Sequence, residues 1–272
     1  MIHRILKGLA PLAALAGAAL VTGCDNMNIH IGDGDGVPLA GLDMSGAAPT
    51  ELVLAGPDKV IVTEGEKLDI AVSGEDAAVN AVRFSLGEGS LGISRAKDTG
   101  KIGGVATVRV TMPSLTAMVL AGSGDIEAAS MRGKADVTIA GSGKAKVARF
   151  DADSLDLTIA GSGSFEGAGT VDMLDMTVAG SGKADMAGLK VGNADISVAG
   201  SGDAEFASDG KVDASIMGSG TITVNGRADC TVNAMGSGTL NCRDIRTATQ
   251  APTAPDAPSS PAAPDAPAAP ET

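Results

Sequence analysis

Apolar and polar positions alternate along the middle of this chain, in step with seven Gly-Ser-Gly triplets. The first glycines of the triplets are Gly122, Gly141, Gly161, Gly180, Gly200, Gly218 and Gly236. Apolar columns stand two and four residues before them, as Ile139, Ile159, Val178, Val198, Ile216 and Ala234, and as Val137, Leu157, Met176, Ile196, Ala214 and Val232. Polar residues stand between these columns, and the alternation resumes after each triplet. A period of two is typical of a half-buried strand, so each repeat is predicted to be strand, tight turn and strand.

The spacing of the triplets predicts the architecture. Successive first glycines stand 18 to 20 residues apart, which indicates one unit stacked on copies of itself. Two strands cannot bury their apolar sides alone, so the repeats are expected to wind into a coil around a narrow interior. The sequence therefore predicts an all-β fold, a parallel β-helix or β-solenoid with Gly-Ser-Gly turns. A meander of hairpins is the competing interpretation.

Composition divides the chain into four segments. They are a lipoprotein signal peptide at 1–23, a lipidated cysteine and flexible tether at 24–50, the β-solenoid at 51–246 and a Pro/Ala-rich tail at 247–272. Within the solenoid, residues 51–112 are irregular and are expected to form opening coils and a cap, whereas residues 113–246 hold the regular repeats. Prolines recur every third residue from Pro252 to Pro270, so the tail is expected to be disordered and extended.

The N-terminus has the features of a bacterial secretory signal. Arg4 and Lys7 precede an apolar run that ends at Val21. Val21-Thr22-Gly23-Cys24 resembles a lipobox, in which the cysteine is acylated and the signal is cut before it. Cys24 is therefore the predicted lipidation site, and a membrane is the predicted partner through this anchor. The expected location is the bacterial cell envelope, on the outer membrane or the periplasmic face of the inner membrane.

Charge and residue content limit the possible functions. The formal net charge is −13, and removal of Arg4 and Lys7 with the signal leaves about −15, which disfavours nucleic acid as a partner. His3 and His30 both precede the predicted solenoid, so a Ser-His or Cys-His pair has no base there. The sequence predicts a non-enzymatic protein without cofactor or bound metal. A carboxylate-dependent polysaccharide lyase or hydrolase on a parallel β-helix is the alternative.

Met112-Pro113-Ser114-Leu115, followed by the Ala-Gly-Ser-Gly turns, resembles a known bacterial envelope family. This family is the autotransporter adhesin head GIN domain, long carried as a domain of unknown function. The resemblance covers about Glu51 to Arg243. It implies a β-solenoid at the cell envelope that serves as an adhesin-like or structural binding scaffold, and it brings no catalytic residue to this chain.

One acidic column is the main candidate for binding. Aspartates stand five residues before the triplets, as Asp136, Asp156, Asp175, Asp195 and Asp213, and a Thr/Ser column follows two residues later. Carboxylates stacked at the strand spacing of about 4.8 Å repel one another. Solvent screening with hydrogen bonds to the hydroxyls can relieve this repulsion, and so can bridging cations. The column is therefore a candidate cation site and a candidate face for an envelope or surface ligand that the sequence does not identify.

Two cysteines fall in the last repeat. Cys230 lies six residues before Gly236 and Cys242 six residues after it, both in inward-facing columns. An exported protein folds in an oxidising compartment, so the sequence predicts a disulfide that pins the last coil. Two buried free thiols are the alternative, because facing sheets commonly lie too far apart for a bridge.

Overall fold

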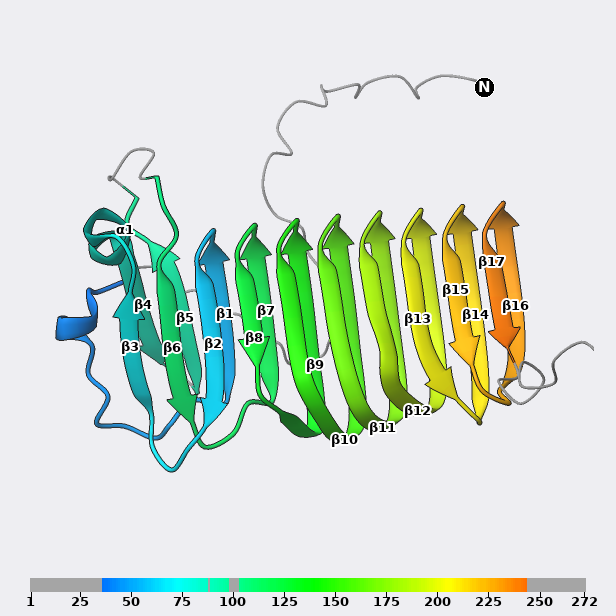
Figure 1. The fold of residues 1–272 in the computed structure, drawn as a ribbon, viewed down its shortest axis with the longest axis horizontal. Helices are drawn as coiled ribbons and strands as arrows, with labels where there is room; N and C mark the ends of the chain where they lie inside the picture. The colour runs from blue at the N-terminus through cyan, green and yellow to red at the C-terminus, as the bar shows by residue number, and fades with distance from the viewer. Residues whose placement is uncertain (1–35, 88, 98–102, 244–272) are drawn as a thin grey trace, which may run out of the picture. The chain divides into compact units, whose positions relative to one another are not determined.

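The computed structural model describes residues 36–87, 89–97 and 103–243, which are almost entirely β-structure. They form a parallel β-solenoid of about 7 turns of roughly 19 residues, which confirms the predicted fold class (Figure 1). The strands are β1 (Glu51–Gly56), β2 (Lys59–Glu64), β3 (Asp69–Ser73), β4 (Val82–Gly87), β5 (Ser90–Arg95), β6 (Thr107–Met112), β7 (Ala117–Gly122), β8 (Asp125–Ala128), β9 (Met131–Gly141), β10 (Lys144–Gly161), β11 (Ser164–Gly180), β12 (Lys183–Gly200), β13 (Asp203–Ser208), β14 (Lys211–Gly218), β15 (Thr221–Asn225), β16 (Asp229–Gly236) and β17 (Thr239–Arg243). A short 3-10 helix η1 (Leu39–Gly41) and the helix α1 (Asp76–Ala81) complete the described elements.

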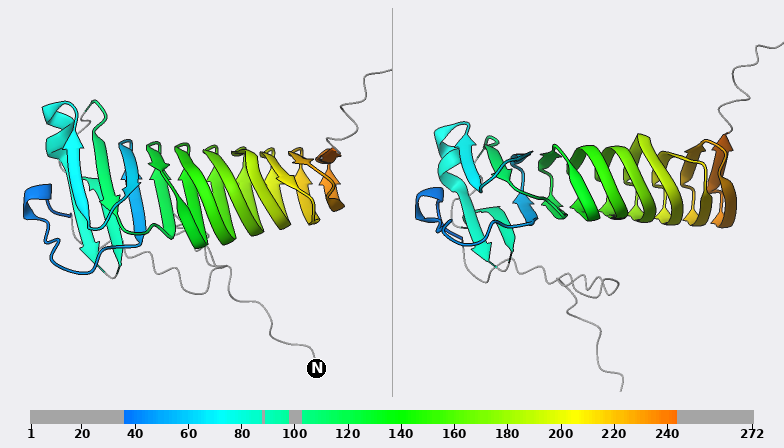
Figure 2. Two further views of the ribbon diagram at one scale, coloured as in Figure 1. Left: turned by 60° about the horizontal axis from the view of Figure 1, so that its bottom comes forward. Right: turned by 90° about the horizontal axis from the view of Figure 1, so that it is seen from below.

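Each coil contributes a strand segment to each of two walls, visible in Figure 2. The first wall contains β5, β1, β7, β9, the C-terminal halves of β10, β11 and β12, then β14 and β16. The second wall contains β6, β2, β8, the N-terminal halves of β10, β11 and β12, then β13, β15 and β17. All of these pairs are parallel, so the hairpin meander is wrong. The chain passes from the first wall through a Gly-Ser-Gly turn to the second wall, and returns around a corner.

Glycine is needed in the turns because successive coils approach closely there. Gly141 has a φ of +131°, a conformation that other residues rarely adopt. A Cβ on Gly141 would overlap the carbonyl oxygen of Gly122 in the preceding coil, and a Cβ on Gly143 would overlap that of Gly124. The N–H of Ser142 donates to the Gly122 oxygen over 2.9 Å. The hydrogen-bond ladder therefore continues through the turns and keeps the coils in register.

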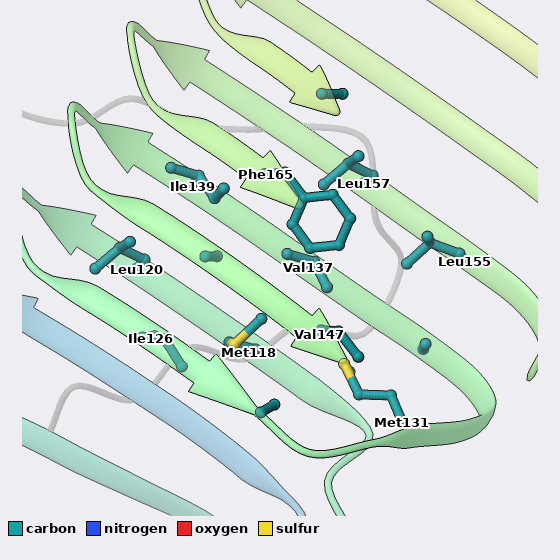
Figure 3. Close-up of a cluster of buried hydrophobic side chains, with 14 of the residues drawn as sticks. Met118, Leu120, Ile126, Met131, Val137, Ile139, Val147, Leu155, Leu157 and Phe165 are labelled. Atoms are coloured by element: carbon teal, nitrogen blue, oxygen red, sulfur yellow. The ribbon is translucent and has the colours of Figure 1, made fainter. Parts of the chain in front are cut away.

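The core lies between the two walls, and Figure 3 shows part of it. The apolar columns before the triplets are buried in every coil except the last. Large and small side chains complement one another along the stack. Phe165 lies between Ala145 and Ala184 in the register of the second wall, and its ring centroid is 6.2 Å from that of Phe150. A Cβ on Gly167 would press on both rings, so the absence of a side chain there makes room for them.

The coils at the N-terminal end do not stack in chain order. β1 and β2 lie between the coil of β5 and β6 and the coil of β7 and β8. Beyond β5 and β6, the antiparallel strands β4 and β3 end the two walls, and α1 lies between them in the chain. Ile70 of β3 and Phe84 of β4 are buried, and Val37 pairs with Phe84. The irregular sequence before the first triplet thus forms a closed end.

A buried ion pair fastens this closed end. Asp58, in the turn between β1 and β2, is 1% exposed, and Arg95 of β5 donates to its two carboxylate oxygens over 2.9 and 2.5 Å. Asp58 also accepts the N–H of Ala106 at 2.8 Å, and Arg95 donates to the Gly104 carbonyl at 2.9 Å. The hydrogen bond with Asp58 raises the pKa of Arg95. The pair therefore connects β1, β5 and the segment that leads into β6.

The C-terminal end is open within the part of the chain that the structure describes. There β16 pairs only with β14, and β17 pairs only with β15. Val232 is 47% exposed and Ala234 is also exposed, although both continue columns that are buried in the preceding coils. The last repeat keeps the predicted inward register, but no described strand covers it.

Candidate binding surface

The aspartate column lies on the outer face of the first wall. The structure stacks Asp136, Asp156, Asp175, Asp195 and Asp213 as direct cross-strand partners, in the predicted order. Beside it run a Thr/Ser column and a column of alanines, represented in β9 by Thr138 and Ala140. Because side chains alternate along a strand, all three columns point away from the core. From β9 to β12 the first wall therefore repeats the same short side chains from coil to coil.

The electrostatic environment of the carboxylates differs along the aspartate column. The pKa of Asp136 is raised to about 6, first by burial and then by repulsion from Asp156 and Glu51, against the opposing effect of a hydrogen bond with Thr138. Burial, followed by repulsion from its two neighbours in the column, also raises the pKa of Asp175. These shifts show that the stack retains part of its mutual repulsion.

Asp213, at the other end of the column, has a different partner. Lys211 donates to the Asp213 carboxylate over 2.6 Å, and this hydrogen bond lowers the pKa of Asp213. Across the described residues, no three or more Asp, Glu, His or Cys side chains gather where they could hold a metal ion. The column is a line of single carboxylates, and its candidate role as a cation site stays a prediction.

The second wall carries mixed charges instead. Its outer positions form two columns, which read Asp125, Lys144, Ser164, Lys183 and Asp203, and Glu127, Lys146, Glu166, Asp185 and Glu205. Ion pairs form along this wall, with Lys59 2.7 Å from Glu127 and Lys146 3.0 Å from Glu166. Two open hollows of about 330 and 320 Å³ lie over the same strands, and Lys146 and Glu166 line both.

These hollows combine acids with a lysine, as a polysaccharide lyase site would, but the lysine is not suited to act as the base. The hydrogen bond with Glu166 raises the pKa of Lys146, which disfavours this lysine as the group that removes a proton. The side chains of this pair are more than half exposed, so they are not desolvated. Asp136, whose pKa approaches that of a general acid, lies on the first wall and lines neither hollow.

The structure brings the two predicted disulfide cysteines together. It joins the Sγ atoms of Cys230 on β16 and Cys242 on β17, with their Cα atoms 6.7 Å apart. Cys230 is half-buried and Cys242 is exposed, because their coil is the open one. Cys24, the signal, residues 25–35 of the tether and the tail lie outside the described residues. Residues 36–50 of the predicted flexible tether are described, and they lie against the fold, where Val37 pairs with Phe84 and Leu39 packs on the core. Within the described part of the chain, no helix is both long and apolar enough to span a membrane.

Sequence reasoning missed an apolar strip at the open end. The outward column directly before the triplets reads Ala140, Ala160, Ala179, Ala199, Met217 and Met235. Met217 is 54% exposed and Met235 is 66% exposed. The change from alanine to methionine at a fixed repeat position was the available signal. The Asp58–Arg95 pair was also missed, because its members lie 37 residues apart in irregular sequence.

Comparison with known proteins gives a family and a fold. The model of the family described as "Putative auto-transporter adhesin, head GIN domain" matches residues 48–228. No curated protein matches the chain.

Among solved structures, a putative adhesin from Bacteroides fragilis is similar at a TM-score of 0.66 and 20% identity, over 72% of this chain and 93% of that one. A putative lipid binding protein from Parabacteroides distasonis is similar at 0.57 and 22%, over 73% and 94%. A putative adhesin from Parabacteroides merdae is similar at 0.56 and 17%, over 72% and 92%. At these identities the similarity shows the fold alone.

Proposed function

Since the chain belongs to the family of auto-transporter adhesin head GIN domains, we propose that it is a non-enzymatic, adhesin-like scaffold that a lipid on Cys24 holds at the cell envelope. The observation that carries this proposal is the in-register stack of five aspartates on the first wall. A regular stack offers equivalent positions to a repetitive ligand.

The chemistry of the first wall favours a polymer that bears cationic groups. A single exposed carboxylate binds an amine weakly, because solvent and salt screen the attraction. Several equivalent carboxylates on a rigid wall act together, since each contact after the first is intramolecular. Raised pKa values at Asp136 and Asp175 fit this role, because an approaching cation would relieve the repulsion that contributes to them.

Binding of the chain to immobilised chitosan, an amine-bearing polysaccharide, tests this proposal. The triple variant Asp156→Asn, Asp175→Asn and Asp195→Asn removes the centre of the column and is expected to lose most binding. The matched control changes Asp151, Asp153 and Asp172 to Asn, which removes the same charge from exposed positions outside the column. Equal binding by the two variants would show that net charge, and not the column, attracts the polymer.

The lipid anchor has its own test. Cys24→Ser is expected to abolish labelling by radioactive palmitate and to prevent normal processing of the signal. In cell fractionation, the variant should then no longer be found with the membrane fraction that holds the acylated protein. Unchanged labelling of the variant would contradict the anchor, whatever the outcome of the chitosan experiment.

An enzymatic function is not favoured. The solved relatives reported above are named as adhesins or a lipid binding protein, and none is named as an enzyme. Asp136, the aspartate with the most raised pKa in the column, lines neither hollow, and the Glu166 carboxylate, which lines both, is exposed.

A further inference from the structure

The open C-terminal end has properties that the display of aspartates does not require. We propose that β16 and β17 form an interface for a second copy of this chain, so that two solenoids pair end to end through their last coils. Each of these strands has a partner on one side only among the described residues. An edge strand with free N–H and C=O groups is a template for pairing with another strand.

The edge lacks the charges that usually protect such strands. The outward positions of β16 and β17 hold the uncharged residues Thr231, Asn233, Thr239 and Asn241. In earlier coils, the columns of Thr231, Thr239 and Asn241 contain aspartate, glutamate or lysine. Charged residues occur only at the strand ends, as Asp229 and Arg243. Soluble proteins commonly place charges on an edge to prevent association, so their loss at this end favours pairing.

Apolar side chains surround the same edge. Val232 and Ala234 point into the uncovered core, with exposure of 47% for Val232, and Leu240 of β17 is partly buried against that core. Met217 and Met235, stacked on the outer face of the first wall, are both more than half exposed. A partner at this end would therefore cover apolar surface as well as backbone groups.

The sequence beyond β17 does not supply a further repeat. Positions 18 residues after Val232 and Ala234 hold Gln250 and Pro252, so the inward columns end. Proline then recurs every third residue to Pro270, and each proline lacks the N–H that a ladder requires. The tail is thus poorly suited to pair with β16 or β17 along their length.

A second copy fits through two-fold symmetry. The N-terminal end is closed by antiparallel β3 and β4, which argues against a head-to-tail chain of solenoids. A two-fold axis that crosses both walls would pair β16 with its copy and β17 with its copy, antiparallel in each case. Such an interface uses the same surface on both chains and closes after two, so it does not propagate into a fibre.

The size of the end supports a reversible dimer. The eight residues of β16 extend about 26 Å. Because the two walls lie about 10 Å apart and carry side chains on their outer faces, the surface area of this end is roughly 500 Å². Two copies would bury about 1,000 Å², near the lower limit for a specific interface. Antiparallel pairing would add about a dozen backbone hydrogen bonds. We therefore expect association in the micromolar range.

Sedimentation velocity of the full chain, across micromolar concentrations in one detergent, tests the dimer. The unchanged chain is expected to show a monomer–dimer equilibrium. Asn233→Lys places a charge at the middle of β16, where the two-fold axis brings the two copies close, and should weaken the dimer at least about tenfold. Ser197→Lys changes the same column two coils earlier and should leave the dimer unaffected.

Each other result would overturn the proposal. A chain that stays monomeric throughout has no such interface, and if deletion of residues 252–272 then produces the dimer, the tail covers the edge. A dimer that Asn233→Lys and Ser197→Lys weaken equally forms elsewhere on the surface. Assemblies that grow beyond two copies with concentration would contradict the closed two-fold arrangement. None of these results depends on chitosan binding, so the two proposals can fail separately.

Discussion

The last inward-facing residues of the solenoid are buried at its N-terminal end and more exposed at its described C-terminal end. Ile70 and Phe84 end the stack on the N-terminal side and are buried, whereas Val232 on the C-terminal side is 47% exposed. The N-terminal end reverses the strand direction in β3 and β4 and adds α1, while the described residues end at Arg243 with a regular coil. A repeat therefore specifies walls and core but cannot specify its own ending, which requires sequence that departs from the repeat.

The largest expected contrast lies between two valines of one inward column. Val137 is fully buried in β9, and Val232 holds the same repeat position in the open coil. Val137→Asp should lower the free energy of unfolding by about 4 kcal/mol or more, because it places a carboxylate in the core. Val232→Asp should cost under about 1 kcal/mol, because its side chain reaches solvent. Urea denaturation of dilute protein measures both, and equal losses would mean that the last coil is covered.

A second contrast concerns the ion pair of the closed end. Arg95→Met leaves the Asp58 carboxylate buried without its guanidinium, which should cost about 3–5 kcal/mol. Arg132→Met is the control, because the Arg132–Glu64 pair, at 3.1 Å, is largely exposed and should contribute under about 1 kcal/mol. Denaturation gives the two losses, and hydrogen exchange should place the Arg95→Met effect in β1, β5 and β6. Similar losses for both variants would show that the buried pair does not fasten this end.

The Cys230–Cys242 disulfide should stabilise only the coil at the open end. It closes a loop of 12 residues, which the chain-entropy model values at about 3 kcal/mol. Replacing Cys230 and Cys242 by serine should therefore accelerate amide exchange in β16 and β17 and leave β10 in the same sample unchanged. Mass spectrometry of the unreduced protein provides the direct check. Two thiols that alkylate without reduction would contradict the bridge.

The sequence was sufficient for the regular part of the fold because each coil repeats one pattern at one spacing. Ile159 and Leu157 could be assigned to the core, and Asp156 and Asp175 to one outer column, from alternation and period alone. The same logic gave the inward positions of the two cysteines.

The rest could not be predicted, because it depends on contacts between segments that share no pattern. Nothing in the alternation indicates that β1 and β2 insert between later coils, or that Asp58 meets Arg95. The repeat pattern also gives no sign of where the stack ends, because Val232 has the same repeat position as Val137 although no described strand covers it. For the candidate site, the column was predictable but its electrostatics were not, because burial differs from coil to coil.

The smallest expected effect is a difference in the pH dependence of stability between Asp136 and Asp213, the first and last residues of the aspartate column. Burial raises the pKa of Asp136 from 3.8 to about 6, so the folded state binds this proton more tightly than the unfolded state. The ionised carboxylate therefore destabilises the fold fully above about pH 6, and this penalty disappears as the pH falls towards 3.8. Asp136→Asn should stabilise the protein at neutral pH, and its advantage should shrink on acidification.

Asp213→Asn should have the opposite sign, which provides the control for Asp136→Asn. The hydrogen bond from Lys211 lowers the pKa of Asp213, so its carboxylate stabilises the fold above the unfolded value of 3.8. That contribution is lost as the pH falls through the lowered folded-state pKa. Asp213→Asn should therefore slightly destabilise the protein at neutral pH and be neutral in strong acid. Denaturation midpoints of both variants from about pH 2 to 8 measure the difference. A shift of the same sign in both variants would contradict the opposite environments that the structure gives the first and last aspartates of the column.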